Sequence, residues 1–178
     1  MQTYGRLTLV PALERADLLG ETVRDALASW EHAAEVLVAE IDPELADTAA
    51  MTEAYDVPLE ASANCVVVMG RRAGEERTAA CVVRADTRAD VNNVVKRSLD
   101  VRKCSFLARE RAVEETRMEY GGITPIGLPE AWRLLVDSRV GDIGLAIVGS
   151  GVRGSKLFLP GRLLGALPGA EVVVGLAG

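Results

Sequence analysis

The chain has 178 residues, a formal net charge of −6, and a composition that is 49% hydrophobic but only 4% aromatic. A chain of this length can bury about two-thirds of its unfolded surface as one domain, without disulfides or metal ions. With so few aromatic residues, the interior must be built from Val, Leu, Ala and Ile, which favours a mixed α/β protein over an aromatic-rich sandwich. The acidic balance argues against a general nucleic-acid coat and leaves only a local basic rim for contact with a polyanion.

No segment predicts export or a membrane span. The N-terminus MQTYGRLTLV lacks a basic stretch ahead of a long apolar one, and no run approaches the ~18 continuous apolar residues of a spanning helix. We therefore expect a cytoplasmic protein without membrane contact. Cys65, Cys81 and Cys104 are odd in number and never in C-x-x-C spacing, so we expect buried thiols rather than a disulfide framework or a zinc site.

Hydrophobic spacing in the N-terminal half predicts helices over residues 12–30, with an interruption at Gly20, then a strand over 34–41 and a helix over 45–55. Two runs rich in Val and Cys follow, 63–69 and 78–84, separated by the polar sequence GRRAGEER. They predict a β-hairpin with a longer loop.

The C-terminal half predicts helices over 89–99 and 107–116, the first capped by Asp86 or Thr87. Strands are predicted over 134–136, 143–148, 156–159 and 172–174, with a helix over 162–166. There is no internal repeat, low-complexity tract or linker. We therefore predict one α/β domain with a mostly antiparallel central sheet, preceded by a helical N-terminal extension over residues 1–34.

Several familiar motifs are set aside. Gly149–Gly154 fits G-x-G-x-x-G, but a short β-like run follows it where a dinucleotide site needs a helix, so a tight turn is favoured. His32, the sole histidine, has no partner at metal-ligand spacing. The sequence also has no G-x-S-x-G motif whose serine could use this histidine as a catalytic base. Glu114 and Glu115 are adjacent and do not share a helical face, which favours a solvated edge over an acid/base pair.

The segment Met118–Pro129, MEYGGITPIGLP, has five Gly or Pro residues in an apolar run. Two consecutive glycines leave peptide groups uncovered, and Pro125 stiffens the far side of the loop. Such a loop can present backbone N–H and C=O groups to a small ligand. It can equally be a tight turn between core elements.

The order and approximate spacing of these motifs resemble the YbaK/EbsC-type aminoacyl-tRNA deacylases, the family that includes the editing domain inserted in bacterial prolyl-tRNA synthetases. The resemblance covers roughly residues 35–178, which we expect to form the deacylase-like domain. The matching segments are Ile41-Asp42-Pro43 with the helix after it, Asn64–Met69, Arg102–Phe106, Gly121–Gly127 and Gly149–Gly154.

The resemblance implies a curved, mostly antiparallel mixed sheet flanked by helices, and a freestanding hydrolase that cleaves the ester joining a wrong amino acid to tRNA. The partners would be a mischarged tRNA and, as a further candidate, an aminoacyl-tRNA synthetase, but not DNA. No metal or other cofactor is implied. Such editing is needed because a hydrophobic pocket separates similar small side chains by only about 1–3 kcal/mol.

The resemblance also assigns roles to single residues. Catalytic roles fall to Asn64 and to the backbone at Gly121 and Gly122, whose fixed dipoles can stabilise a developing oxyanion. The expected substrate-binding residues are Ile123, Thr124, Pro125, Gly127, Gly149, Ser150 and Gly151. The candidates for a tRNA-binding rim are Arg102, Lys103, Arg153 and Lys156, each of which is equally well explained as an ordinary surface charge.

One position departs from the family pattern. Typical members have a functionally important lysine where this chain has Asn64, in the run Ala63-Asn64-Cys65-Val66. An asparagine can donate and accept hydrogen bonds but carries no charge. The alternative is therefore a non-catalytic module that binds tRNA ends, amino acids or a protein partner. An unrelated structural α/β domain would require the ordered motif matches to be a coincidence.

Overall fold

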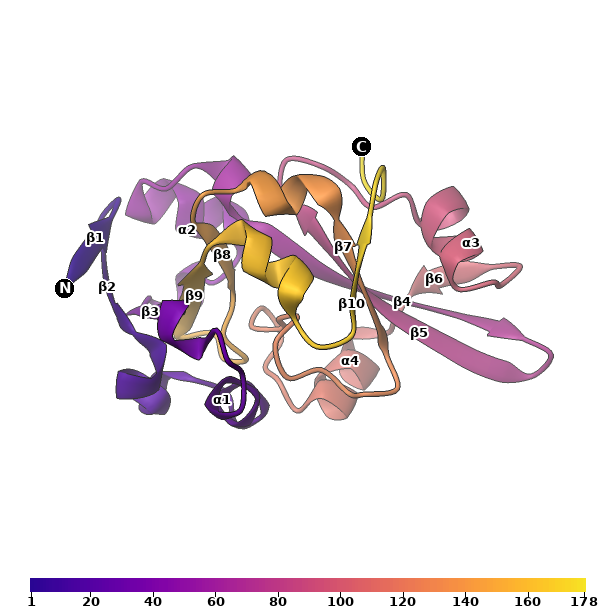
Figure 1. Ribbon diagram of the computed structural model, residues 1–178, viewed down its shortest axis with the longest axis horizontal. Coiled ribbons are helices and arrows are strands. Elements are labelled where there is room, and N and C mark those ends of the chain that lie inside the picture. The colour runs from indigo at the N-terminus through magenta and orange to yellow at the C-terminus, as the bar shows by residue number, and fades with distance from the viewer.

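The computed structural model describes all 178 residues, and its two five-stranded sheets follow one another along the long axis of the molecule (Figure 1). The first sheet has the order β1-β2-β3-β9-β8 and is antiparallel throughout. The second has the order β10-β7-β5-β4-β6, in which β7 runs parallel to both β5 and β10. The strands are β1 (Gln2–Tyr4), β2 (Leu7–Pro11), β3 (Leu37–Glu40), β4 (Ala63–Arg72), β5 (Glu75–Arg84), β6 (Cys104–Phe106), β7 (Arg133–Asp137), β8 (Ala146–Gly149), β9 (Ser155–Leu159) and β10 (Ala170–Val173).

Short helices connect the strands, and none of them is both long and apolar enough to cross a membrane. The α-helices are α1 (Glu21–Ala28), α2 (Thr48–Tyr55), α3 (Lys96–Ser98) and α4 (Arg109–Thr116). A π-helical turn, η5 (Val91–Val95), leads into α3. The 3-10 helices are η1 (Ala12–Leu18), η2 (Ala33–Glu35), η3 (Pro43–Leu45), η4 (Leu59–Ala61), η6 (Ser138–Asp142) and η7 (Gly161–Ala166).

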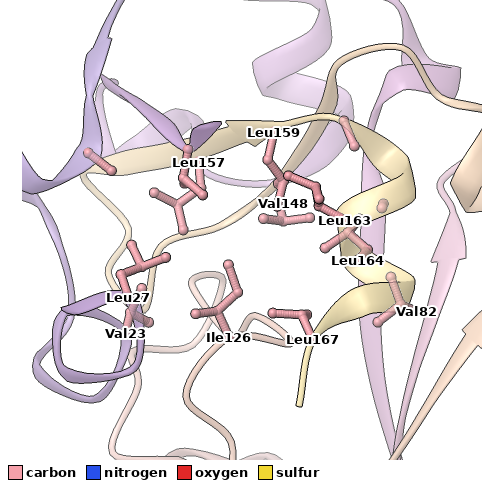
Figure 2. Close-up of a cluster of buried hydrophobic side chains, with 14 of the residues drawn as sticks. Val23, Leu27, Val82, Ile126, Val148, Leu157, Leu159, Leu163, Leu164 and Leu167 are labelled. Carbon is pink, nitrogen blue, oxygen red and sulfur yellow. The ribbon is translucent and has the colours of Figure 1, made fainter. Parts of the chain in front are cut away.

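The largest core lies between the two sheets. Successive residues of the central strand β5 alternate between this core, which takes Ala80 and Val82, and a second cluster that takes Ala79 and Cys81. Because both faces of β5 are covered over residues 79–83, this part of the strand is continuously apolar instead of alternating with polar residues. Figure 2 shows the centre of the largest core, where α1, the 118–129 loop, β8, β9 and the η7 region contribute Val23, Leu27, Ile126, Val148, Leu157, Leu159, Leu163, Leu164 and Leu167.

The α/β class and the mostly antiparallel pairing are confirmed, with the strands divided between two sheets instead of one. A parallel bridge between Ser62 and Ile147 places the start of β4 beside β8 and so connects the sheets. Residues 1–34 contain the predicted helices, but they begin with β1 and β2, which the helical prediction missed. Since β2 pairs with β3, this segment is part of the first sheet.

Two local predictions are wrong. The β4–β5 hairpin has no long loop, because pairing continues to Arg72 and Glu75 and only Ala73 and Gly74 lie between them. Both turn residues have positive φ angles, 50° and 81°, which is the geometry of a tight two-residue hairpin turn. The helix after β5 is capped by Asp90, whose carboxylate accepts from the Asn93 amide at 3.1 Å, and not by Asp86 or Thr87.

Candidate functional site

A cavity of about 280 Å³ lies where the start of α2, the start of β4, the glycine loop and strands β8 and β9 meet. The parallel bridge between Ser62 and Ile147 brings β4 to this place, and the pairing of Gly149 with Lys156 aligns β8 and β9 along its wall. The cavity therefore joins segments that are far apart in the sequence. Its lining residues are Ala46, Asp47, Thr48, Met51, Ser62, Ala63, Asn64, Cys65, Tyr120, Gly121, Ile123, Ile147, Val148, Gly149 and Lys156.

The glycine loop and the turn after β8 are fastened backbone to backbone. The Gly151 amide donates to the Gly122 carbonyl oxygen at 2.7 Å, and the Glu119 amide donates to the Gly151 carbonyl oxygen at 2.9 Å. A Cβ on Gly122 would lie 2.7 Å from the Val152 nitrogen, and one on Gly149 would lie 2.6 Å from the Gly122 oxygen. Only residues without a side chain allow this approach, so these glycines fix the shape of the cavity wall.

Two residues that line the cavity have unpaired backbone amides. Gly121 and Ile123 both line the cavity, and their N–H groups donate no hydrogen bond within the protein. Backbone amides held in place by a rigid loop can stabilise negative charge on a ligand oxygen without having to reorganise.

Lys156 is the only cationic side chain that lines the cavity. It extends from β9 and is only 7% exposed, and its Nζ donates to the Gly121 carbonyl oxygen at 3.4 Å. Burial and, to a smaller extent, nearby Arg153 lower the pKa of Lys156 to about 8, and Asp47 opposes this shift. The sequence analysis placed this residue on an exposed rim, whereas the structure places it inside the cavity.

Asn64 lines the cavity from the start of β4. Its Oδ1 accepts a hydrogen bond from the Thr48 hydroxyl at 3.0 Å. No other hydrogen bond engages the side chain, so its NH₂ group has no protein partner. The neighbouring Cys65 also lines the cavity, and burial raises the pKa of its thiol, which keeps it protonated and a poor nucleophile.

The structure brings together only some of the residues predicted to bind the substrate. Ile123 and Gly149 line the cavity with Gly121, whereas Pro125 and Gly127 line a second cavity of about 550 Å³ near Trp30 and Trp132. The other predicted substrate-binding residues, Thr124, Ser150 and Gly151, are buried behind the wall. Gly122, which was predicted to be catalytic, is buried there too, and its amide already donates to the Glu119 carbonyl oxygen at 2.9 Å. Their geometric role is to support the wall.

The predicted rim cations are not together either. Arg153 lies next to the cavity, where its guanidinium donates to the carbonyl oxygens of Tyr120 and Pro43, both at 3.1 Å. Arg102 and Lys103 precede β6, which pairs with β4 at Val68–Gly70. Gly70 is about 20 Å along β4 from Asn64, since a strand rises about 3.3 Å per residue. No cluster of three or more His, Cys, Asp or Glu side chains is arranged to hold a metal ion.

Comparison with known proteins places this arrangement in a family. A family model that describes the aminoacyl-tRNA editing domain matches residues 42–166, which include α2, β4, the glycine loop and β9. The chain belongs to the aminoacyl-tRNA editing domain family, of the YbaK type. The editing domain family supports an aminoacyl-tRNA editing role for the chain and a tRNA as its substrate. A search of curated proteins found no match.

Solved structures share the editing-domain fold. Hypothetical protein APE2540 is 19% identical with a TM-score of 0.76, and the match covers 89% of this chain and all of that one. A protein described as a "putative trans-editing enzyme for prolyl tRNA synthetase" is 17% identical with a TM-score of 0.73, and the match covers 87% of this chain and 94% of that one. At these identities the likeness shows the fold alone.

The sequence analysis missed several residues around the cavity. Asp47, Thr48 and Met51 were predicted only as part of the helix over 45–55, and Ser62 and Tyr120 were not singled out. The Ser62 hydroxyl is buried and has no hydrogen-bond partner. The motif Ile41-Asp42-Pro43 with its following helix could have pointed to Asp47 and Thr48, because that helix begins at the cavity. Nothing in the sequence marks Ser62.

Proposed function

We propose that this protein hydrolyses the ester bond of a mischarged aminoacyl-tRNA, with the amino acid bound in the 280 Å³ cavity. The observation that carries the proposal is the pair of unpaired amides, Gly121 and Ile123, on the wall of a small cavity. Hydrogen-bond donors fixed in this way can stabilise the negative charge that develops on the ester carbonyl oxygen when the carbonyl carbon is attacked. The family membership of the chain supports the same reaction.

The size of the cavity favours a small or medium-sized amino acid. Its volume equals that of about nine water molecules, at about 30 Å³ for each in the liquid. The walls are partly apolar, with Met51, Ile123 and Ile147 beside the polar groups. An apolar pocket of limited size excludes large side chains and accepts smaller ones, which is the behaviour of a second, hydrolytic sieve.

The test is a deacylation panel. Purified protein is incubated with tRNAs that carry small and medium-sized non-cognate amino acids, and release of the labelled amino acid is followed over time against buffer. We expect acceleration for at least one small aminoacyl ester and none for the aromatic ones. If no member of the panel is accelerated at high protein concentration, but the tRNAs still bind, the non-catalytic binding module replaces this proposal.

A further inference from the structure

We propose that Lys156 is a catalytic residue of this site: its ammonium group binds the carbonyl oxygen of the aminoacyl ester and stabilises the negative charge that forms there during hydrolysis. This inference rests on the proposed deacylase function and adds a chemical role for one side chain. The positive charge would then reach the ester from β9, and not from position 64 on β4.

The position of Lys156 in the sheet directs its side chain toward the cavity. Its cross-strand neighbours are Ala39 on β3 and Gly149 on β8, both of which leave space above the sheet. Along β9, Leu157 and Leu159 face the largest core, while Phe158 belongs to the cluster that packs around α2. Because side chains alternate along a strand, Lys156 lies on the same face as Phe158, next to the start of α2.

The ammonium group is buried without adequate partners. A lysine has three N–H donors, yet Nζ makes one long hydrogen bond, to Gly121, and no carboxylate lies within 4.0 Å of it. Burying an unpaired charge is costly, and a chain that only needed to fill this space could use an apolar residue. The unused donors and the free amides of Gly121 and Ile123 line the same cavity, so one ligand oxygen can satisfy both.

Position 64 cannot supply this charge. Asn64 is neutral, and the Thr48 hydroxyl already occupies its Oδ1. Arg153 also lies close, but its guanidinium is held by the carbonyl oxygens of Pro43 and Tyr120 and does not line the cavity. Lys156 is therefore the one positive charge available to an ester bound there.

The reaction balances without a cofactor. A water molecule attacks the ester carbonyl carbon, and the electron pair of the C=O bond moves to the oxygen, where the Lys156 ammonium and the loop amides stabilise it. The C–O bond to the ribose then breaks and the carbonyl re-forms. The ribose oxygen takes one proton derived from the water, the other proton goes to solvent, and the amino acid leaves with a free carboxylate.

This role makes the rate depend on pH in a specific way. Lys156 is largely protonated at pH 7, and its stabilising charge is lost as the pH rises through about 8. The groups that face it are Arg153 in the turn, Asp47 before α2, Cys65 on β4 and Tyr120 in the loop. We expect the enzyme-dependent part of kcat, corrected for the spontaneous hydrolysis of the ester, to fall above pH 8.

The decisive variant is Lys156→Met, which keeps an unbranched side chain only one atom shorter and removes the charge. We expect kcat to fall about 10²–10³-fold, as when one oxyanion donor is lost, and the decline above pH 8 to disappear. The melting temperature should stay the same or rise, because a buried charge is removed. A purely structural lysine would show the reverse: a lower melting temperature, an unchanged kcat and an unchanged pH profile, and that result would overturn the proposal.

A second variant tests whether the charge itself matters. Asn64→Lys combined with Lys156→Met moves the ammonium from β9 to the start of β4, which also lines the cavity, and we expect it to raise kcat at least tenfold above that of Lys156→Met. Failure to recover any activity, with the melting temperature maintained, would mean that the geometry at β9 and not the charge alone is needed, and would overturn the idea that position 64 can exchange roles with position 156.

A binding measurement separates failure of this inference from failure of the proposed function. The probe is an adenosine that carries an amide-linked amino acid at its 3′ position, which cannot be hydrolysed. We expect Lys156→Met to weaken its binding at least tenfold relative to the unaltered protein. Turnover and probe binding that both persist in Lys156→Met would overturn only the role of Lys156, whereas an unaltered protein with no turnover and no probe binding would overturn both proposals.

Discussion

At the start of β4, the Asn64 amide oxygen accepts from the Thr48 hydroxyl, and this leaves the NH₂ group of a cavity-lining residue without a protein partner. If that group holds the substrate, Asn64→Ala should slow deacylation about fivefold, the effect of losing one hydrogen bond worth about 1 kcal/mol. Thr48→Val keeps the shape of the threonine side chain but removes the hydroxyl that orients the Asn64 amide. This variant should therefore slow deacylation as well, but less than Asn64→Ala does. Wild-type kcat and KM in Asn64→Ala would remove this residue from the mechanism.

Gly122→Val should harm the protein more than any substitution at Asn64. A Cβ at position 122 would meet the backbone of Val152 at 2.7–2.8 Å, so the loop or the turn must move. We expect a loss of about 1–3 kcal/mol in the free energy of unfolding, as in an overpacked core, and a loss of deacylation. Gly141→Ala is the matched control because nothing lies within 4 Å of its added Cβ. Denaturant unfolding of both variants would measure the contrast, and equal stability would contradict it.

The sequence identified the glycine residues of the site because glycine and proline stand out in an apolar run. It could not place Lys156, since a lysine is expected at the surface unless it is paired. Its burial follows from the tertiary pairing of β9 between β3 and β8, where Ala39 and Gly149 leave space for it. Ser62 was missed because a parallel bridge between distant segments leaves no local sequence pattern.

The C-terminal end of β7 is tied to the C-terminus by Asp137, which is only 1% exposed. Its carboxylate accepts from the Arg139 amide at 3.0 Å and from the Ala177 amide at 2.9 Å. Burial raises the pKa of Asp137, but the hydrogen bonds from Arg139 and Ala177 outweigh it, so the pKa lies below its ordinary value. The folded state therefore prefers the charged form, and this contribution to stability is present at neutral pH and is lost as the pH falls through the folded-state pKa.

Asp137→Asn should consequently destabilise the protein by about 1–3 kcal/mol at pH 7, because one buried acceptor is replaced by a donor. Thermal unfolding measured between pH 7 and pH 3 should show a smaller loss on acidification in the variant than in the unaltered protein. Asp142→Asn, at an exposed site in the same region, is the control. If the melting temperatures of Asp137→Asn and of the unaltered protein fall in parallel with pH, the charged Asp137 carboxylate does not make the proposed contribution to stability.

The hairpin turn between β4 and β5 offers a stabilising change. Ala73 has a φ of 50°, which disfavours a residue with a Cβ, whereas Asn tolerates it well. Ala73→Asn should raise the free energy of unfolding by about 0.5–1 kcal/mol, seen as a higher melting temperature, and leave deacylation unchanged because the turn is remote from the cavity.

Most strands could be predicted from hydrophobic spacing, but the turn between β4 and β5 could not. Ala-Gly is a weak turn signal, and the polar residues beside it also suit a longer loop.

Over the whole molecule, charge decides how a tRNA can approach. The net charge of −6 means that binding must use local cations, and Arg102 and Lys103 form no ion pair in the structure. Converting both to Glu should weaken tRNA binding and reduce the slope of log K against log salt by about 2. Arg24→Glu with Arg88→Glu changes the net charge equally at other exposed sites, and should have a smaller effect. Equal effects of the two pairs in a salt titration would mean that only the overall charge acts.

The close approach of Gly20 to Gly151 has a consequence for which substitutions this chain tolerates. A Cβ on Gly20 would lie 3.0 Å from the Gly151 Cα, and the Gly20 amide donates to the Ser150 carbonyl oxygen at 2.9 Å, so a residue outside the family match at 42–166 supports the turn behind the cavity. In a saturation mutagenesis screen scored for deacylation, position 20 should therefore accept fewer replacements than Gly141, whose added Cβ would meet nothing within 4 Å. An alignment restricted to the matched region would not include the position, and an engineer guided by it would treat Gly20 as free to vary.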